Sequence, residues 1–381
     1  MNKKICLITW FNSLNYGTCI QCSALSQYLK KLGYYVFVPD SLQYYYGIKH
    51  PIESFNRILR KIKYKIIHPI RLNTFDNLPD NIKNGYKVRM KKNAEFSYEY
   101  NNIYKITSNK DFQQMIKTTE VFITGSDQIW NPAFCSPTLL LSFVNQGKRI
   151  SYASSIGVPQ ISCKYEKMYK KYLSRFDALA VREKTAKSAL EILLKDTAYN
   201  KPIQVVLDPS FLLTSDEWKK MTNVAVASER KFVFTYFIGG NRNWETTVQD
   251  FVAQKNLDLY CAISEANVIP NVGIVKADMG VEEFISYIAN AEYVVTDSFH
   301  AVALSIIFNK KFVVYKRFSD ANKDSQNSRI TDLLNLFRIP ERLVENDISC
   351  IDDEIDYSKI NDIIDSKRTE AKTYLLNSIE N

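Results

Sequence analysis

Short apolar runs alternate along the chain with longer segments whose apolar residues recur at helical spacing. The first run, at 3–10, is too short to span a bilayer and predicts a β-strand. Residues 19–32 carry apolar side chains at helical spacing, Gly33 suits the end of that helix, and a second apolar run follows at 34–38. This β-α-β order is typical of Rossmann-like folds with parallel sheets.

The same alternation continues through the rest of the chain and divides it into two units. We expect an α/β protein with an N-terminal Rossmann-like domain at 1–211, a linker at 212–230 and a C-terminal Rossmann-like domain at 231–381. We also expect the last helix, at 357–378, to cross back to the first domain. A helix begins at Ser328, which we interpret as its cap. Further strands are predicted at 121–124, 149–153, 178–181, 205–207, 231–238, 258–263, 293–296 and 312–315, with helices at 111–117, 165–176, 186–194, 244–255, 281–289 and 301–309.

Strand after strand ends in a polar or glycine-containing loop. The strand at 293–296 leads into Asp297, Ser298, Phe299 and His300, and an apolar helix follows. Open α/β sheets bind ligands at the carboxyl ends of their strands, and helix N-termini favour anions. Gly17, after the first strand, either permits close approach to a ligand or forms a simple tight turn. The loops on one edge of the sheet therefore predict a shared cleft.

Composition and charge add one local feature to a globular chain. The 381 residues are 46% hydrophobic and 24% charged, which are ordinary globular values. The net charge of +9 is uneven, because 49–92 holds twelve Lys/Arg against three acidic residues. Aromatic and branched residues interleave with these cations, as in 57–65, which suits a peripheral surface facing anionic lipid or a diphosphate. A solvated helical insertion packed on the domain is the alternative; nucleic acid is not favoured, because no binding module accompanies the charge.

Metal and redox chemistry are not indicated by the cysteines and histidines. The seven cysteines are scattered, and Cys19 and Cys22 fall inside a helical pattern, which favours buried thiols over a zinc or redox site. His50 and His68 lie in the basic segment without matching ligands, so we expect no metal and no cofactor. No small-residue cleavage site follows the first apolar run, so we expect a cytoplasmic protein. Association with the inner face of the membrane is an alternative that we also consider.

Seven segments, taken in order over about 3–335, resemble the polysaccharide pyruvyl transferase family. The resemblance implies a GT-B-like pair of domains facing a cleft. It also implies transfer of pyruvate from phosphoenolpyruvate (PEP) to two sugar hydroxyls, forming a ketal. The acceptor would be a bacterial-type capsule or exopolysaccharide, or its lipid-linked precursor. The segments are NYGTCIQ at 15–21, GSDQIWNP at 125–132, SYASSIG at 151–157, VREKT at 181–185, LDPS at 207–210, VTDSFH at 295–300 and SRI at 328–330.

The resemblance also assigns candidate roles to residues of these loops. Arg182 matches the position expected to grip the donor. His300 matches the family's histidine, which could give a proton to the enol carbon or hold the phosphate as an imidazolium. Asp127 and Asp297 are candidate bases by position, although Asp127 could instead stabilise its loop and Asp297 could cap the helix after it. The further candidate substrate-binding residues are Asn15, Gly17, Ser126, Ser298 and Arg329.

One departure from the family pattern bears on the donor. Better-characterised members carry an arginine two residues before this histidine, where this chain has Ser298. A short hydroxyl cannot replace a bidentate cation. Arg329, Lys316, Arg317 and Arg242 are possible substitutes, with Arg329 preferred because it lies in a family-like segment. The departure leaves open a nucleotide-sugar glycosyltransferase on the same scaffold, and a non-catalytic scaffold protein in polysaccharide assembly.

Overall fold

The computed structural model describes residues 3–40, 78–158, 160–222, 224–226, 228, 230–240, 242–264, 269–317 and 327–381. Residues 49–77 of the basic segment at 49–92 therefore lie outside the described residues, and residues 78–92 are described. His50, His68 and the 57–65 stretch belong to that part.

The N-terminal half is built on a five-stranded parallel sheet in the order β3-β2-β1-β4-β5. Two more parallel strands pair with each other and extend the β5 edge through isolated bridges from Ile150 to Ala178 and from Ser154 to Val181. The strands are β1 (Lys4–Ile8), β2 (Tyr35–Asp40), β3 (Ile103–Lys105), β4 (Val121–Thr124), β5 (Lys148–Ser151), β6 (Leu179–Val181) and β7 (Ile203–Val205).

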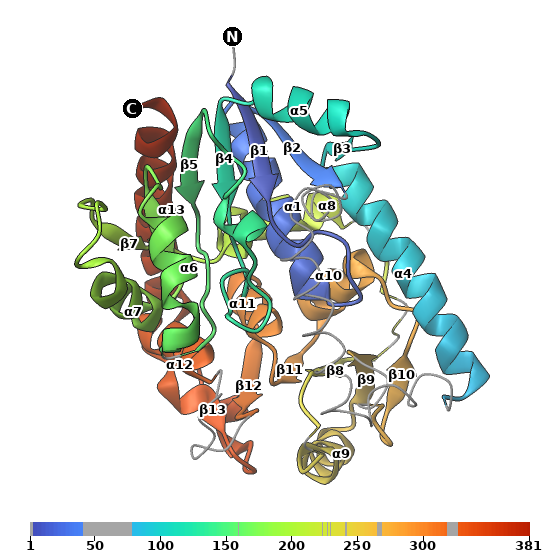
Figure 1. Cartoon of the computed structure of the whole chain (residues 1–381). Helices are drawn as coiled ribbons and strands as arrows, with labels where there is room; N and C mark the ends of the chain where they lie inside the picture. Colours follow the sequence, from blue (N-terminus) through green and yellow to red (C-terminus); the bar gives the residue numbers. More distant parts are fainter. Residues whose placement is uncertain are drawn as a thin grey trace.

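The C-terminal half holds a six-stranded parallel sheet in the order β10-β9-β8-β11-β12-β13. Figure 1 shows this sheet below the first one, with helices packed around and between them. The predicted α/β class with parallel sheets in two units is confirmed. The strands are β8 (Phe232–Phe237), β9 (Asp258–Ile263), β10 (Ile274–Lys276), β11 (Tyr293–Thr296), β12 (Lys311–Tyr315) and β13 (Leu343–Val344).

Helices connect the strands of both sheets, as the β-α-β pattern predicts. The α-helices are α1 (Tyr16–Lys31), α4 (Asp80–Tyr100), α5 (Asn109–Lys117), α6 (Cys163–Leu173), α7 (Lys184–Leu194), α8 (Ser215–Met221), α9 (Trp244–Lys255), α10 (Val281–Asn290), α11 (Phe299–Ile307), α12 (Ser328–Leu336) and α13 (Tyr357–Glu380). The 3₁₀ turns are η2 (Pro137–Leu140), η3 (Pro209–Leu212), η4 (Pro340–Arg342) and η5 (Ser349–Asp352).

Residues 80–92 of the basic segment are helical and pack on the domain, in line with the alternative of a helical insertion, but the full extent of α4 and the short strands β3, β10 and β13 were not predicted. The reason for α4 is that Gly85, Arg89, Asn93 and Ser97, four residues apart and all buried, interrupt the apolar pattern of its packing face. A search for apolar residues at helical spacing does not detect such a face. Arg89 is fully buried and donates hydrogen bonds to carbonyls of both halves, those of Leu14 and Ile263. The predicted cap of α12 was also wrong, because Ser328 is the first helical residue and Asn327 precedes it.

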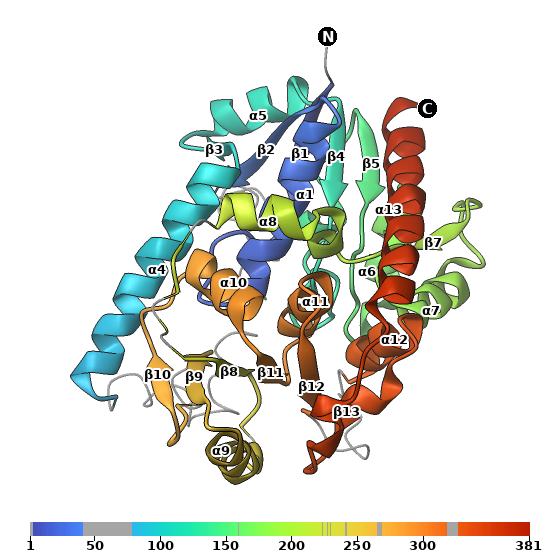
Figure 2. The same ribbon diagram turned by 180° about the vertical axis from the view of Figure 1, so that it is seen from behind.

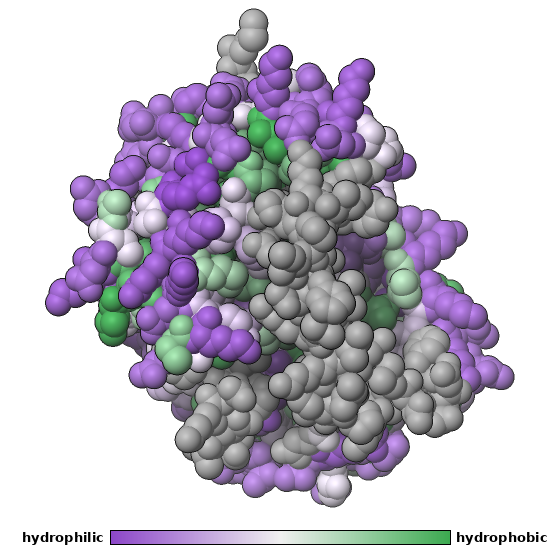
Figure 3. Space-filling view, in the orientation of Figure 1, coloured by the Kyte–Doolittle hydropathy of each residue, from purple (hydrophilic) through white to green (hydrophobic). Residues whose placement is uncertain are grey.

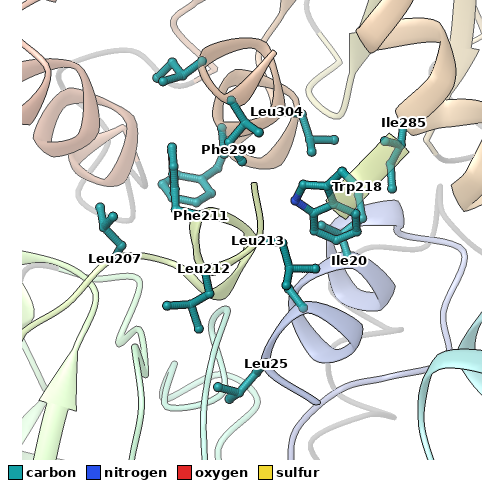
Figure 4. Close-up of a cluster of buried hydrophobic side chains, with 14 of the residues drawn as sticks. Ile20, Leu25, Leu207, Phe211, Leu212, Leu213, Trp218, Ile285, Phe299 and Leu304 are labelled. Carbon is teal, nitrogen blue, oxygen red and sulfur yellow. The ribbon is translucent and has the colours of Figure 1, made fainter. Parts of the chain in front are cut away.

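One hydrophobic cluster runs through both halves. Figure 4 shows Ile20 and Leu25 of α1 facing Leu212 and Leu213, with Trp218 nearby. Phe299 and Leu304 of α11 close the cluster from the C-terminal half. Burial of these side chains removes the interface between the halves from water and fixes the position of α11 against α1 and η3.

The last helix crosses back to the N-terminal half, as predicted. α13 runs alongside β5 in both ribbon views (Figures 1 and 2). The Tyr374 hydroxyl donates to the Ser151 carbonyl at 2.7 Å, and Lys148 Nζ donates to the Ile379 carbonyl at 3.0 Å. Arg368 adds bonds to the carbonyls of Phe211 and Leu213, at 2.6 and 2.9 Å. Both halves are therefore tied together by the C-terminal segment.

The face of the molecule seen in Figure 3 is mostly polar where it is described. Hydrophilic side chains cover much of the face in Figure 3, outside the grey region. Among the described helices, none has the length and apolar character that a bilayer crossing requires.

We predict that Tyr374→Phe lowers the free energy of unfolding by about 1 kcal/mol, because the buried Ser151 carbonyl loses its donor from α13. Urea unfolding followed by circular dichroism measures the change. The matched control is Tyr98→Phe on α4, where the side chain is 46% exposed. Equal stability of the two variants would show that this bond does not anchor α13.

Candidate active site

The turn after β11 is shaped by its own side chains. Ser298 is the N-cap of α11: its Oγ accepts from the Ala301 N–H at 3.5 Å, and its own N–H donates to Thr296 Oγ1 at 3.0 Å. Ser298 is 2% exposed. The serine that stands in place of an arginine therefore serves the backbone of the turn, and it presents His300 in the first turn of α11.

Asp297 is occupied by the neighbouring strand. Its two carboxylate oxygens accept from the N–H groups of Ile238 and Gly239, both at 2.7 Å, directly after β8. Arg317 Nε lies 3.3 Å from Oδ2. Asp297 thus joins the ends of β8 and β11 and does not cap α11, which corrects the alternative of a helix cap. These contacts favour a structural role for Asp297.

His300 reaches from the C-terminal half into the N-terminal half. A Cβ placed on Gly17 would lie 2.1 Å from His300 Nδ1, so a glycine is required where the ring passes. Asn15 is the N-cap of α1, and its Oδ1 accepts from the Gly17 N–H at 2.9 Å. The close approach predicted at Gly17 is therefore made by a protein side chain.

On its other side, the imidazole of His300 faces a buried carboxylate. His300 Nε2 lies 3.7 Å from Asp208 Oδ2 and has no hydrogen-bond partner among the described residues. Burial lowers the pKa of His300 below its usual 6.5; Asp208 and Asp127 oppose this shift, and Arg182 adds to it. The imidazole is therefore neutral at neutral pH, and its Nε2 is available to exchange a proton.

Asp208, in the loop three residues after the end of β7, connects the side chains of the site. Its Oδ2 accepts from Arg182 NH1 at 2.8 Å and from Ser126 Oγ at 3.0 Å. Its Oδ1 accepts from the N–H and the hydroxyl of Ser210 at 3.0 and 2.8 Å. Burial alone would raise the pKa of Asp208, but His300, Arg182 and the Ser210 N–H lower it to about 2. Asp208 is therefore a fully ionised buried carboxylate.

Arg182 is held rigidly at the end of β6. Its Nε donates to Glu183 Oε1 at 2.8 Å, and its guanidinium carbon lies 4.2 Å from the ring centroid of Phe299. Its NH2 makes no hydrogen bond within the described part of the chain and lies 3.9 Å from Asp127 Oδ1. The guanidinium group is therefore fixed, and its NH2 group points toward Asp127.

Arg329 approaches the same carboxylate from the C-terminal half. Its NH1 lies 3.8 Å from Asp127 Oδ1, and the residue is 6% exposed. Burial, together with the charge of Arg182, lowers the pKa of Arg329 to about 10, so the side chain is still a cation at neutral pH. Two arginines from opposite halves thus flank Asp127.

The other cations considered as substitutes for the missing arginine have different neighbours. Arg317 contacts Asp297, Lys316 Nζ lies 2.9 Å from Glu345 Oε1, and Arg242 Nε lies 3.6 Å from Glu245 Oε1. The structure places Arg329, of these four, beside Asp127 and Arg182.

Sequence reasoning did not select Asp208, Glu183 or Phe299 as site residues. The signal for Asp208 was present, because an acidic residue directly follows a predicted strand in LDPS at 207–210. Phe299 gave no signal, since a phenylalanine at the start of an apolar helix is an ordinary core residue.

A pocket of about 120 Å³ opens beside these groups, and its charged lining includes Arg182, Glu183, Asp208 and Arg329. Among the described residues, no group of three or more His, Cys, Asp or Glu is placed to hold a metal ion.

Comparisons with known proteins bear on the family and the fold of the chain. The model of the polysaccharide pyruvyl transferase family matches residues 15–317. Among solved structures, a UDP-N-acetylglucosamine 2-epimerase is similar over 99% of this chain and 96% of its own, with 10% identity and a TM-score of 0.51. An S. aureus MnaA-UDP structure is similar over 98% of this chain and 90% of its own, with 12% identity and a TM-score of 0.49. No curated protein matches the sequence. The structural likeness is one of fold.

We predict that Asp208→Asn lowers the free energy of unfolding at neutral pH by about 3 kcal/mol, because Arg182 and Ser126 lose a buried anionic acceptor. Asp362→Asn, on the exposed face of α13, is the matched control. The carboxylate's contribution is present above its usual pKa of 3.8 and is lost as pH falls toward about 2. Urea unfolding should therefore show a constant gap between wild type and Asp208→Asn near neutral pH and a narrowing gap below about pH 4. A gap that stays unchanged in acid would contradict the assignment of an ionised carboxylate.

Proposed function

The chain belongs to the polysaccharide pyruvyl transferase family, and we propose that it moves pyruvate from PEP to two hydroxyls of a sugar, forming a ketal. The observation that carries this proposal is the convergence of Arg182 and Arg329, from opposite halves, on one carboxylate position beside His300. PEP carries a carboxylate and a phosphate, and guanidinium groups bind both with paired hydrogen bonds. The two cations are matched to such a donor.

The chemistry balances with donor and acceptor alone. The first sugar hydroxyl gives its proton to the base as its oxygen bonds to C2 of PEP, and C3 takes a proton from the acid and becomes a methyl group; return of the base's proton to the acid restores both groups. The C2–O bond to the phosphate then breaks, and the phosphate leaves with the electron pair. The second sugar oxygen bonds to the same carbon and loses its proton, which the phosphate carries away. The reaction requires an acid at C3, a base at each hydroxyl and cations at the departing phosphate.

The site residues fit these tasks. His300 is the proposed acid: its Nε2 is unpartnered, and an anionic donor nearby would raise the pKa that burial lowers. Asp127 is the proposed base, since it is the most exposed carboxylate of the site, at 17% of its side chain. Arg182 and Arg329 are the proposed donor grips, and Asp208 holds Arg182 in place.

The acceptor is proposed to be a sugar of a surface polysaccharide, such as a capsule or exopolysaccharide, or of its lipid-linked precursor. A cytoplasmic enzyme at the inner face of the membrane would meet such a precursor. The segment 49–92 holds twelve Lys/Arg against three acidic residues, and although Arg89 is buried, the excess of the other cations supports attraction to anionic lipid.

The direct test is an assay of the purified protein with PEP and a panel of model galactosides and lipid-linked sugars. We expect sugar-dependent phosphate release, together with the mass gain of one pyruvate ketal on the acceptor.

Calorimetry separates the alternatives. Binding of UDP or GDP without PEP would support a nucleotide-sugar glycosyltransferase, for which the serine at position 298 is the motivating observation. Binding of none of these would support a non-catalytic scaffold.

We predict that Arg329→Gln lowers kcat/KM for PEP by about 10- to 100-fold, because one charge-assisted contact to the donor is lost. Lys316→Gln is the matched control, since that cation pairs with Glu345 and lies away from Asp127. Steady-state kinetics at saturating acceptor measures both variants. Similar losses in the two variants would argue against Arg329 as the replacement for the arginine absent at position 298.

We predict that kcat/KM for PEP falls as pH rises through the lowered pKa of His300, because the proposed acid must be protonated in the free enzyme. The basic limb should therefore lie below about pH 6.5, the ordinary value for histidine. His300→Gln should lose this limb along with most of the activity. A pH profile of identical shape in His300→Gln would remove His300 from proton transfer.

A further inference from the structure

Asp127 occupies the position between the two arginines, but it does not bind them tightly. Its Oδ1 lies 3.9 Å from Arg182 NH2 and 3.8 Å from Arg329 NH1. Both separations exceed the range of an N–H···O hydrogen bond, which ends near 3.2 Å. The carboxylate also acts electrostatically on His300, whose pKa it raises.

The two cations are fixed, whereas the carboxylate between them has room to move. The side chains of Arg182 and Arg329 are 3% and 7% exposed, and Arg182 is held by Glu183, Asp208 and Phe299. The Asp127 side chain is 17% exposed. Its backbone is anchored, because the Ser155 N–H donates to its carbonyl at 2.9 Å. A rotation of the side chain alone can therefore move the carboxylate away from the arginines.

We propose that the Asp127 carboxylate is a placeholder that the anionic donor displaces, and that this displacement makes Asp127 available as the base. The proposal rests on the proposed function. Two carboxylates cannot share the space between the arginines, because like charges this close repel strongly at a partly buried site. The donor can form short charge-assisted hydrogen bonds, which the long contacts of Asp127 do not provide.

The exchange links donor binding to activation of the acceptor. Before the donor binds, Asp127 balances the charge of Arg182 and Arg329 and keeps its oxygens directed at cations. After the donor binds, the carboxylate no longer faces two guanidinium groups, and its oxygens can accept a hydrogen bond from a sugar hydroxyl. A sugar hydroxyl is then deprotonated only when PEP is present to receive its oxygen.

The test is the affinity of Asp127→Asn for PEP, measured by calorimetry without acceptor. Asparagine keeps the shape but removes the competing charge, so PEP should bind about 10-fold more tightly while turnover falls by 100-fold or more. Asp127→Glu keeps the charge and should bind PEP about as wild type does. Asp362→Asn should change neither quantity. Pyruvate and inorganic phosphate, titrated separately, show whether the carboxylate or the phosphate of the donor takes the place of Asp127.

The outcomes separate the two proposals. Equal or weaker PEP binding by Asp127→Asn, with binding by wild type intact, overturns the exchange and leaves the proposed function standing. Absence of PEP binding in wild type overturns the proposed function itself. Asp127→Ser serves as a second variant in case Asp127→Asn does not fold, and tighter PEP binding by either variant supports the exchange.

Discussion

The candidate site depends on one buried anion, the carboxylate of Asp208. It accepts hydrogen bonds from Arg182 and Ser126 on separate loops of the N-terminal half, and it faces His300 from the C-terminal half. A buried charge is stable only where several donors surround it, so its position fixes those of its partners. The same constraint brings the carboxyl ends of strands from both sheets to a common point.

Apolar and steric contacts also hold the charged residues of the site in place. Phe299 lies in the hydrophobic cluster that joins the halves, and the guanidinium group of Arg182 stacks over its ring. Gly17 leaves room for His300 at the start of α1. A small displacement of α11 would therefore disturb the arginine, the histidine and the interface together. Stability of the interface and geometry of the site are a single property of this fold.

The alternation of apolar runs predicted the two parallel sheets because buried parallel strands are nearly continuous in hydrophobic residues. It did not predict the extent of α4, because Gly85, Arg89, Asn93 and Ser97 interrupt the apolar pattern of its buried residues. Local pattern placed Arg182, His300 and Asp127 at strand ends, where the structure brings them together. It could not rank Asp208 above the other acids or show that Asp297 is bound by Ile238 and Gly239, since those facts arise from contacts between distant segments.

The serine at position 298 illustrates how a site can keep its charge while a residue changes. An arginine there would start from the first turn of α11, whereas Ser298 uses its hydroxyl to cap that helix. A cation reaches the neighbourhood instead from α12, as Arg329, and lies beside Asp127 opposite Arg182. The electrostatic requirement of a doubly anionic donor concerns where positive charge lies, not which helix supplies it. The departure from the family pattern is therefore compatible with donor binding through a second arginine from the same half of the protein.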